Sequence, residues 1–179
     1  MGLDQYLSRV ERFGLTPKEI NKIQHYIIWE SKFKDKYSLH DFCGYDENQI
    51  NMTAVEFYKT YGIDDCFGFK GIYEEVGYWR KANAIHKWFV DNIQDGNDDC
   101  GDYEVSKEQL EELLRVCKLV KENHSYAEEY LPTCSGFFFG DTEYDEYYFH
   151  KVDSTIDILQ KVLQATDFNR QMIMYSSSW

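Results

Sequence analysis

Two long segments in the second half of the chain carry apolar residues at helical spacing, which restricts the fold to one with packed helices. Residues 106–123 open with Ser106 and Gln109, a capping box that marks the start of a helix. The inward face of this segment is formed by Leu110, Leu113, Leu114, Cys117 and Val120. A second segment, capped by Asp141 or Thr142, repeats the spacing with Tyr148, Val152, Ile156, Leu159 and Leu163. Both segments are predicted to be amphipathic helices that bury one face in a core.

The first half also contains helical patterns, although they are shorter. Thr16 can cap a helix, Pro17 suits its first position and Glu19 completes a capping box. This helix is expected to run to about residue 35, with Trp29 off the apolar stripe, and to bury Ile20, Ile23 and Ile27. After it the sequence predicts irregular structure at 38–52, a short helix at 53–61 and a glycine-punctuated loop at 62–71.

Short alternating segments near both ends of the chain predict strands. Residues 2–10 alternate loosely, and in residues 172–175 two methionines alternate with Ile and Tyr. The chain has two prolines and no linker rich in Pro, Gly or Ser, so residues 1–179 are predicted to form a single domain. Two end strands that flank helices can pair with each other. The predicted fold class is therefore α+β: a mainly helical domain with a small sheet formed by the terminal strands.

The charge of the chain is strongly negative and unevenly divided. The formal net charge is −13; residues 1–90 hold 12 Lys and Arg against 13 Asp and Glu, whereas residues 91–179 hold 7 against 19. Binding to nucleic-acid phosphates needs a broad basic surface, so direct nucleic-acid binding is not expected. Two interpretations of the acidic half remain: a surface offered to a basic partner, or the ordinary solubility of an acidic intracellular protein.

The cysteines and the lack of long apolar runs indicate the cellular compartment in which the protein is expected. The five cysteines are scattered and lack a C-x-x-C pair, which argues against a disulfide framework and favours a reducing compartment. The first residues lack the apolar core of a signal peptide, and Tyr6 replaces the Ser or Thr of a myristoylation motif. No run approaches the roughly 18–20 apolar residues of a membrane-spanning helix. We therefore expect a cytoplasmic protein with no membrane partner.

A basic, aromatic segment interrupts the acidic chain at residues 75–90, EVGYWRKANAIHKWFV. We interpret it as one helix with an apolar stripe formed by Tyr78, Ala82, Ile85 and Phe89. Its polar residues could bind a nucleotide-like anion, because Arg and Lys contact phosphate, flat rings stack on a base and an amide reads a base edge. The predicted ligand-binding residues are Trp79, Arg80, Lys81, Asn83, His86, Lys87 and Tyr144. In the structural alternative, Arg80 and Lys87 pair with the protein's own carboxylates, and Trp79 and His86 belong to the core or its rim.

Other chemistry has weaker support in the sequence. His40-x-x-Cys43 lacks a second pair at zinc spacing. The loop at residues 91–102 matches a calcium loop only partly, because Ile93 occupies a position that needs an oxygen ligand; a solvated turn is favoured. No P-loop, G-x-G-x-x-G or G-x-S-x-G motif is present. No metal, cofactor or catalytic residue is therefore predicted.

Four segments of this sequence together resemble a family of small uncharacterised proteins encoded by bacteriophages, prophages and their metagenomic relatives: MGLD, EVGYWRKANAIHKWFVDN, SGFFFGDTEYDEYY and the closing SSW. The resemblance covers both ends and most of residues 74–179. Residues 11–70 are more particular to this sequence and do not carry the resemblance. It implies no catalytic residue. It implies an accessory protein in the cytoplasm of a host bacterial cell, and phage accessory proteins of this size often counter host defence by sequestering a nucleotide signal or blocking a defence enzyme.

Three functions follow as hypotheses. The leading one is a non-enzymatic accessory protein that sequesters a small nucleotide-like anion. The second is an acidic inhibitor that mimics nucleic acid and binds a host defence enzyme, through the loop at 91–104 and through Asp141, Glu143, Asp145 and Glu146. Those four carboxylates could instead simply favour the start of a helix through its dipole. The third is a small nucleotide-processing enzyme with a carboxylate or His86 as base. A homodimer stays open in each case.

Overall fold

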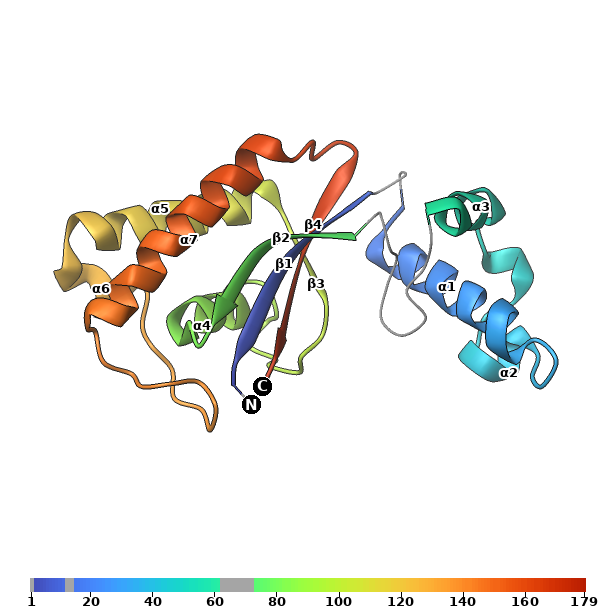
Figure 1. Ribbon diagram of the computed structural model, residues 1–179, viewed down its shortest axis with the longest axis horizontal. Coiled ribbons are helices and arrows are strands. Elements are labelled where there is room, and N and C mark those ends of the chain that lie inside the picture. The colour runs from blue at the N-terminus through green and yellow to red at the C-terminus, as the bar shows by residue number, and fades with distance from the viewer. Residues whose placement is uncertain (1, 12–14, 62–72) are drawn as a thin grey trace. The chain divides into compact units, whose positions relative to one another are not determined.

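The computed structural model describes residues 2–11, 15–61 and 73–179 (Figure 1). Contacts within the chain divide it into two compact units. The sheet unit consists of Met1–Arg9 and Glu75–Trp179, and the helical unit consists of Val10–Glu74. The α+β class is confirmed, because helices predominate and four strands form one sheet. The division into domains stays a prediction.

The sheet contains both terminal strands at its centre. Its order is β2-β1-β4-β3, formed by β1 (Asp4–Glu11), β2 (Tyr73–Arg80), β3 (Tyr103–Val105) and β4 (Gln171–Ser178). Strand β3 runs antiparallel to β4, with Tyr103 opposite Tyr175. The expected pairing of the two end strands is therefore confirmed. The outer strands β2 and β3 come from segments that the sequence did not mark as strands.

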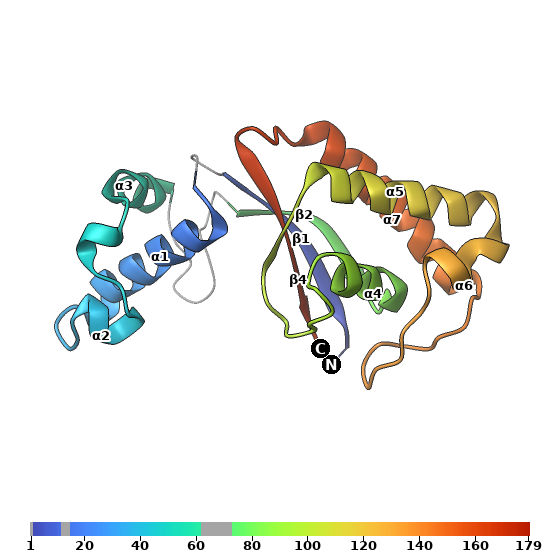
Figure 2. The same ribbon diagram turned by 180° about the vertical axis from the view of Figure 1, so that it is seen from behind.

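Two long helices pack against each other in the sheet unit. They are α5 (Lys107–Glu122) and α7 (Glu146–Ala165), which lie side by side and antiparallel in both views (Figures 1 and 2). The capping box of α5 is present as predicted, since the Gln109 N–H donates to Ser106 Oγ at 3.2 Å. Helix α7 begins later than expected. Asp145, rather than Asp141 or Thr142, caps it by accepting the Tyr148 N–H at 3.0 Å. The other helices are α4 (Asn83–Asn92), α6 (Ala127–Tyr130) and a 3₁₀ turn at His124–Tyr126.

The prediction of one helix over residues 75–90 is wrong. Strand β2 continues to Arg80, and α4 begins only at Asn83. In the strand the side chains alternate, so Trp79 is buried while Tyr78, the expected core residue, is 42% exposed. Gly77 in this strand lies directly against α7. A Cβ at this position would lie 2.6 Å from Ile158 Cγ2, so glycine allows α7 to approach β2 this closely. Sheet pairing and packing against α7 outweigh the helical periodicity.

The helical unit contains α1 (Pro17–Ile28), a π-helical turn at Trp29–Phe33, α2 (Leu39–Cys43), a 3₁₀ turn at Glu47–Gln49 and α3 (Met52–Tyr61). The capping box at Thr16 is confirmed. Trp29 was expected to lie off the apolar stripe, but it is buried and its Nε1–H donates to the Tyr37 carbonyl at 2.8 Å. It packs against Tyr26, which is also buried, with 5.6 Å between the ring centres. The loop predicted at 62–71 lies outside the described residues.

Buried thiol and phenol groups make the fold sensitive to alkali. Burial raises the pKa of Cys117 from 9.0 to about 12, and burial also raises the pKa of Tyr148 and of Tyr175. In the unfolded chain these groups ionise near their ordinary pKa, so unfolding releases protons above about pH 9. The free energy of unfolding should be at its full value below pH 9 and fall as the pH rises toward 12. Urea unfolding at a series of pH values measures this. The free energy of unfolding of a Cys117→Ala variant should fall less steeply with pH. A free energy of unfolding of the wild-type protein that does not change between pH 9 and 12 would contradict the expectation.

Candidate functional site

A cavity of about 330 Å³ lies in the sheet unit, beside the junction between β2 and α4. Its wall comes from that junction with the first turn of α4, from the loop between α6 and α7, and from the first turns of α7. The volume is at the small end of the range for small-molecule sites. Apolar atoms of Leu131 and Val152 form part of the lining, together with charged side chains from all three segments.

The start of α4 opens into this cavity without a side-chain cap. Ala82 occupies the N-cap position, and no side chain there accepts a hydrogen bond from the helix. Residues 82–85 line the cavity. The first N–H groups of a helix have no partner within the helix and carry a partial positive charge. Lys81 has a left-handed backbone, with φ 54°, and its N–H donates to the Leu3 carbonyl at 2.7 Å; this corner fixes the direction of α4.

Lys81 and Lys151 add two positive charges to the cavity wall. Within the part of the chain that the structure describes, neither ammonium group pairs with a carboxylate. Lys151 Nζ lies 4.7 Å from the centre of the Tyr147 ring, a cation–π contact. The Tyr147 hydroxyl in turn donates to the Arg80 carbonyl at 3.2 Å, which ties α7 to the end of β2.

Three carboxylates also line the cavity. Asp145 is occupied as the cap of α7, and Asp141 Oδ1 accepts the Glu143 N–H at 3.2 Å. The Glu143 carboxylate has no hydrogen-bond or ion-pair partner among the described residues. The cavity therefore presents both signs of charge. Of the four predicted protein-binding carboxylates, these three meet at the cavity, whereas Glu146 lies in the first turn of α7 and does not line it.

Asn83 holds the cavity wall together instead of facing a ligand with its amide nitrogen. The side chain is 5% exposed, and its Nδ2 donates to the Phe139 carbonyl at 3.3 Å and to the Asp141 carbonyl at 2.7 Å. These bonds fasten the loop between α6 and α7 to the first residue of α4. In this structure the Asn83 amide nitrogen is bonded within the protein, and the predicted role of Asn83 in reading a base edge stays a prediction.

An Asn83→Asp substitution should cost about 1–3 kcal/mol of the free energy of unfolding. The change places a carboxylate oxygen where an amide now donates to two carbonyl oxygens, although the favourable charge at the start of a helix offsets a few tenths of this. The matched control is Asn92→Asp on the same helix. Its amide also donates to a carbonyl, that of Trp88 at 2.8 Å, but the residue is exposed. Thermal unfolding compares the two, and equal losses would contradict the bridging role of Asn83.

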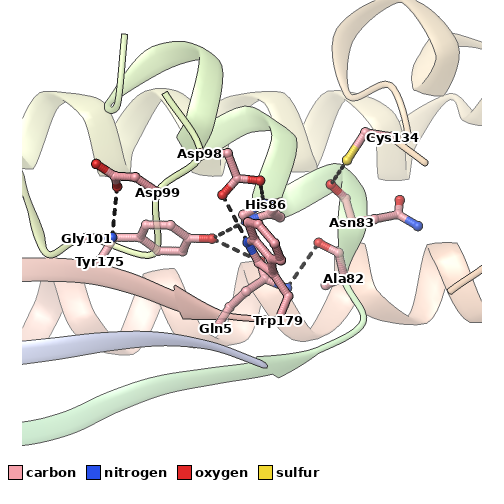
Figure 3. A network of polar contacts seen from close by, with 10 residues as sticks. All are labelled: Gln5, Ala82, Asn83, His86, Asp98, Asp99, Gly101, Cys134, Tyr175 and Trp179. Atoms are coloured by element: carbon pink, nitrogen blue, oxygen red, sulfur yellow. Dashed lines mark hydrogen bonds and ion pairs between the residues drawn. The ribbon is translucent and has the colours of Figure 1, made fainter. Parts of the chain in front are cut away.

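His86 is the centre of a buried polar network rather than a cavity residue (Figure 3). Its ring is 1% exposed; Nδ1 lies 2.8 Å from the Tyr175 hydroxyl and Nε2 lies 2.9 Å from Asp98 Oδ2. Asp98 also accepts the Trp179 indole N–H at 3.1 Å. Burial holds the pKa of the Tyr175 phenol well above its ordinary value. We assign the hydroxyl proton to the bond with Nδ1, since the other acceptor, Gln5 Oε1, is 3.4 Å away.

The remaining predicted ligand-binding residues lie outside the cavity lining. Trp79 is 2% exposed, and its Nε1–H donates to Thr155 Oγ1 at 2.9 Å, as the structural alternative expected. Lys87 pairs with Asp91 at 2.6 Å. Arg80 NH1 lies 3.7 Å from Asp4 Oδ1. Tyr144 packs edge-on against Tyr148 at 5.0 Å between ring centres. Of the seven candidates the cavity therefore brings together Lys81 and Asn83, and the other five serve packing or internal pairing.

Lys151 and Tyr147 are the site residues that sequence reasoning missed. They lie on α7, almost seventy positions from Lys81, and meet it only through the tertiary fold. Their spacing of four residues was visible in the sequence, since residues four apart share a helix face. No local pattern linked that face to the segment at residues 75–90.

The described residues contain no group of three His, Cys, Asp or Glu side chains that could hold a metal ion. Carboxylates in the loop at 91–102 bond within the protein instead. Asp99 accepts from the Gly101 N–H and the Tyr103 hydroxyl, both at 2.9 Å. The four cysteines in the described ranges are free.

A search of the described helices finds none that is long and apolar enough to cross a membrane. The resemblance to phage proteins is not tested by any of these structural features and stays a prediction. Comparisons of the chain with protein-family models, with curated proteins and with solved structures gave no match.

Proposed function

We propose that the protein binds a small nucleotide-like anion, without catalysing its conversion, in the cavity at the start of α4. The observation that carries the proposal is an uncapped helix N-terminus that opens into a cavity whose wall holds two lysines without carboxylate partners. Backbone N–H groups at a helix start and nearby ammonium groups are the usual ligands of phosphate in proteins. The cavity volume of about 330 Å³ suits a ligand no larger than a mononucleotide.

The ligand site in this proposal differs from the one predicted from the sequence. Lys81 keeps its role as a phosphate contact, Lys151 takes the place of Arg80 and Lys87, and the exposed ring of Tyr147 replaces Trp79. Binding is favoured over catalysis because His86, the base of the enzyme hypothesis, is buried and both of its ring nitrogens are engaged. Sequestration of a signal nucleotide in an infected bacterial cytoplasm remains the biological role that the family resemblance suggests.

The proposal is tested by calorimetric titration with nucleoside monophosphates. The wild-type protein should bind at least one of them, and binding should raise its melting temperature. Charge reversal by Lys81→Glu or Lys151→Glu should weaken the affinity by about tenfold or more, because each removes an attraction and adds a repulsion close to the phosphate. Lys161→Glu is the matched control, since Lys161 is exposed on α7 and does not line the cavity. No binding by wild type, or equal loss in the control, would refute the proposal.

A second candidate function, the protein-binding inhibitor, is favoured by one specific observation. Phe137, in the loop between α6 and α7, is 94% exposed, and the same loop carries the exposed Asp141 and Glu143. An exposed aromatic ring beside charges is typical of an anchor in a protein interface. If this candidate is right, a purified partner should lose affinity with Phe137→Ser and with added salt. Binding that is unchanged by both would exclude this surface.

A further inference from the structure

The two edges of the sheet differ in length. In the order β2-β1-β4-β3 the edge strands are β2 and β3, and among the described residues no strand pairs with the outer side of β2. Strand β3 has three residues, and shortness is one of the ways in which proteins keep an edge strand from pairing with another chain. Strand β2 has eight residues and contains no proline. Its outer side is therefore long enough to pair with a strand of another molecule.

The outward backbone groups of β2 belong to alternate residues. The Lys81 N–H donates to the Leu3 carbonyl at 2.7 Å, whereas the carbonyl of the same peptide, that of Arg80, accepts a hydrogen bond from α7. The two groups of a trans peptide point in opposite directions, so the Arg80 carbonyl points away from β1. Successive residues of a strand direct their N–H and C=O groups to alternate sides, so Val76 and Tyr78 also direct theirs away from β1. These residues are the ones that can bond to a further strand.

The charges along β2 complement a second copy of the same strand. Glu74 and Arg80 lie at equal distances in sequence on either side of Gly77. If two copies run antiparallel with Gly77 opposite Gly77, Glu74 of each copy lies opposite Arg80 of the other, and Val76 lies opposite Tyr78. In this register the outward groups of Val76 and Tyr78 meet as hydrogen-bonded pairs. Opposite charges, and an aromatic ring beside a β-branched residue, stabilise such pairs, and a shift by two residues would lose both charge pairs.

The side chains that this pairing uses are accessible. Glu74, Tyr78 and Arg80 are all exposed, and the Arg80 side chain is 54% exposed. Arg80 NH1 lies 3.7 Å from Asp4 Oδ1, which is longer than a hydrogen bond. A guanidinium group has five N–H donors, so it can meet a second carboxylate without giving up this contact.

We propose that the protein forms a homodimer in which β2 pairs antiparallel with β2 of a second copy, centred on Gly77. The pairing joins two four-stranded sheets into one continuous sheet. This interface is separate from the proposed nucleotide binding and does not depend on it.

Sedimentation of the full-length chain over a series of concentrations tests the charge pairs. The wild-type protein should show a monomer–dimer equilibrium. Arg80→Glu should raise the dimer dissociation constant by at least about tenfold, because symmetry replaces two attractive pairs with two repulsive ones. Glu74→Arg combined with Arg80→Glu exchanges the charges and should restore the dimer. Lys161→Glu, on the exposed side of α7, makes the same change in net charge and should have little effect.

A second pair of variants tests the backbone ladder. Tyr78→Pro and Tyr78→Ala both remove the exposed ring, but only proline removes the outward N–H. Tyr78→Pro should therefore weaken the dimer more than Tyr78→Ala, and the melting temperature of each monomer checks that it folds. A wild-type protein that stays monomeric at every concentration would overturn the proposal, and so would a dimer that neither Arg80→Glu nor Tyr78→Pro weakens. Failure of the charge exchange to restore the dimer would overturn the register centred on Gly77.

Discussion

Trp79→Ala is expected to lower the free energy of unfolding by about 3–5 kcal/mol. The indole is 2% exposed in the core of the sheet unit and packs near Phe89, with 6.1 Å between ring centres. Truncation would leave a cavity and would also remove the hydrogen bond from Nε1 to Thr155 Oγ1. Urea unfolding followed by circular dichroism measures the change.

The neighbouring Tyr78→Ala is the control for this experiment. Tyr78 lies on the other face of β2 and is 42% exposed, so its loss should cost about 1 kcal/mol or less. If the two substitutions had equal effects on stability, Trp79 would not be a core residue. The helix that the sequence predicted here would place Tyr78 in the core, so this pair of variants distinguishes that helix from the strand.

His86→Leu is expected to cost about 2–3 kcal/mol, because it removes the partner of two buried or half-buried groups. The Tyr175 hydroxyl loses its 2.8 Å contact with Nδ1, and Asp98 loses its 2.9 Å contact with Nε2. A buried polar group without a partner costs about 1–3 kcal/mol, while Asp98 keeps the Trp179 indole N–H and is partly hydrated. Chemical denaturation gives the value directly.

A double-mutant cycle with Tyr175→Phe tests whether this loss comes from the network. Phenylalanine keeps the stacking of ring 175 on Phe89, whose centre lies 3.9 Å away, and deletes only the hydroxyl. If His86 and Tyr175 are bonded, the double variant should lose at least about 0.5 kcal/mol less than the two single variants added together. Strict additivity would contradict the hydrogen bond between them.

The fold was predictable where periodicity and capping agree with tertiary packing. Ser106 with Gln109 and Thr16 with Glu19 mark helix starts that the structure contains, because these local hydrogen bonds do not depend on the rest of the chain. Residues 75–90 were predicted wrongly, since their apolar spacing fits a helix equally well. Pairing of β2 with β1 decides in favour of a strand, and that partner is about seventy residues away in the sequence.

The candidate site was predictable only in part, for the same reason. Composition alone singled out residues 75–90, and Lys81 does line the cavity. Composition could not show that Lys81 lines a cavity while Lys87 does not. Lys87 forms an ion pair with Asp91, which lies one helical turn away. The other wall of the cavity requires the packing of α7 beside α4. The tertiary arrangement that brings Lys151 and Glu143 to Lys81 has no local signal in the sequence.

The most direct test of a ligand site at the start of α4 is a nuclear magnetic resonance titration of the ¹⁵N-labelled protein with a nucleoside monophosphate. Backbone N–H groups that bind phosphate change their chemical shifts strongly, so the amides of Asn83, Ala84 and Ile85 in the first turn of α4 should move first and saturate together. The same amides should not move in Lys81→Glu at equal concentrations. Shifts confined to other parts of the chain, or no shifts at millimolar nucleotide, would contradict the assignment of this cavity as the binding site.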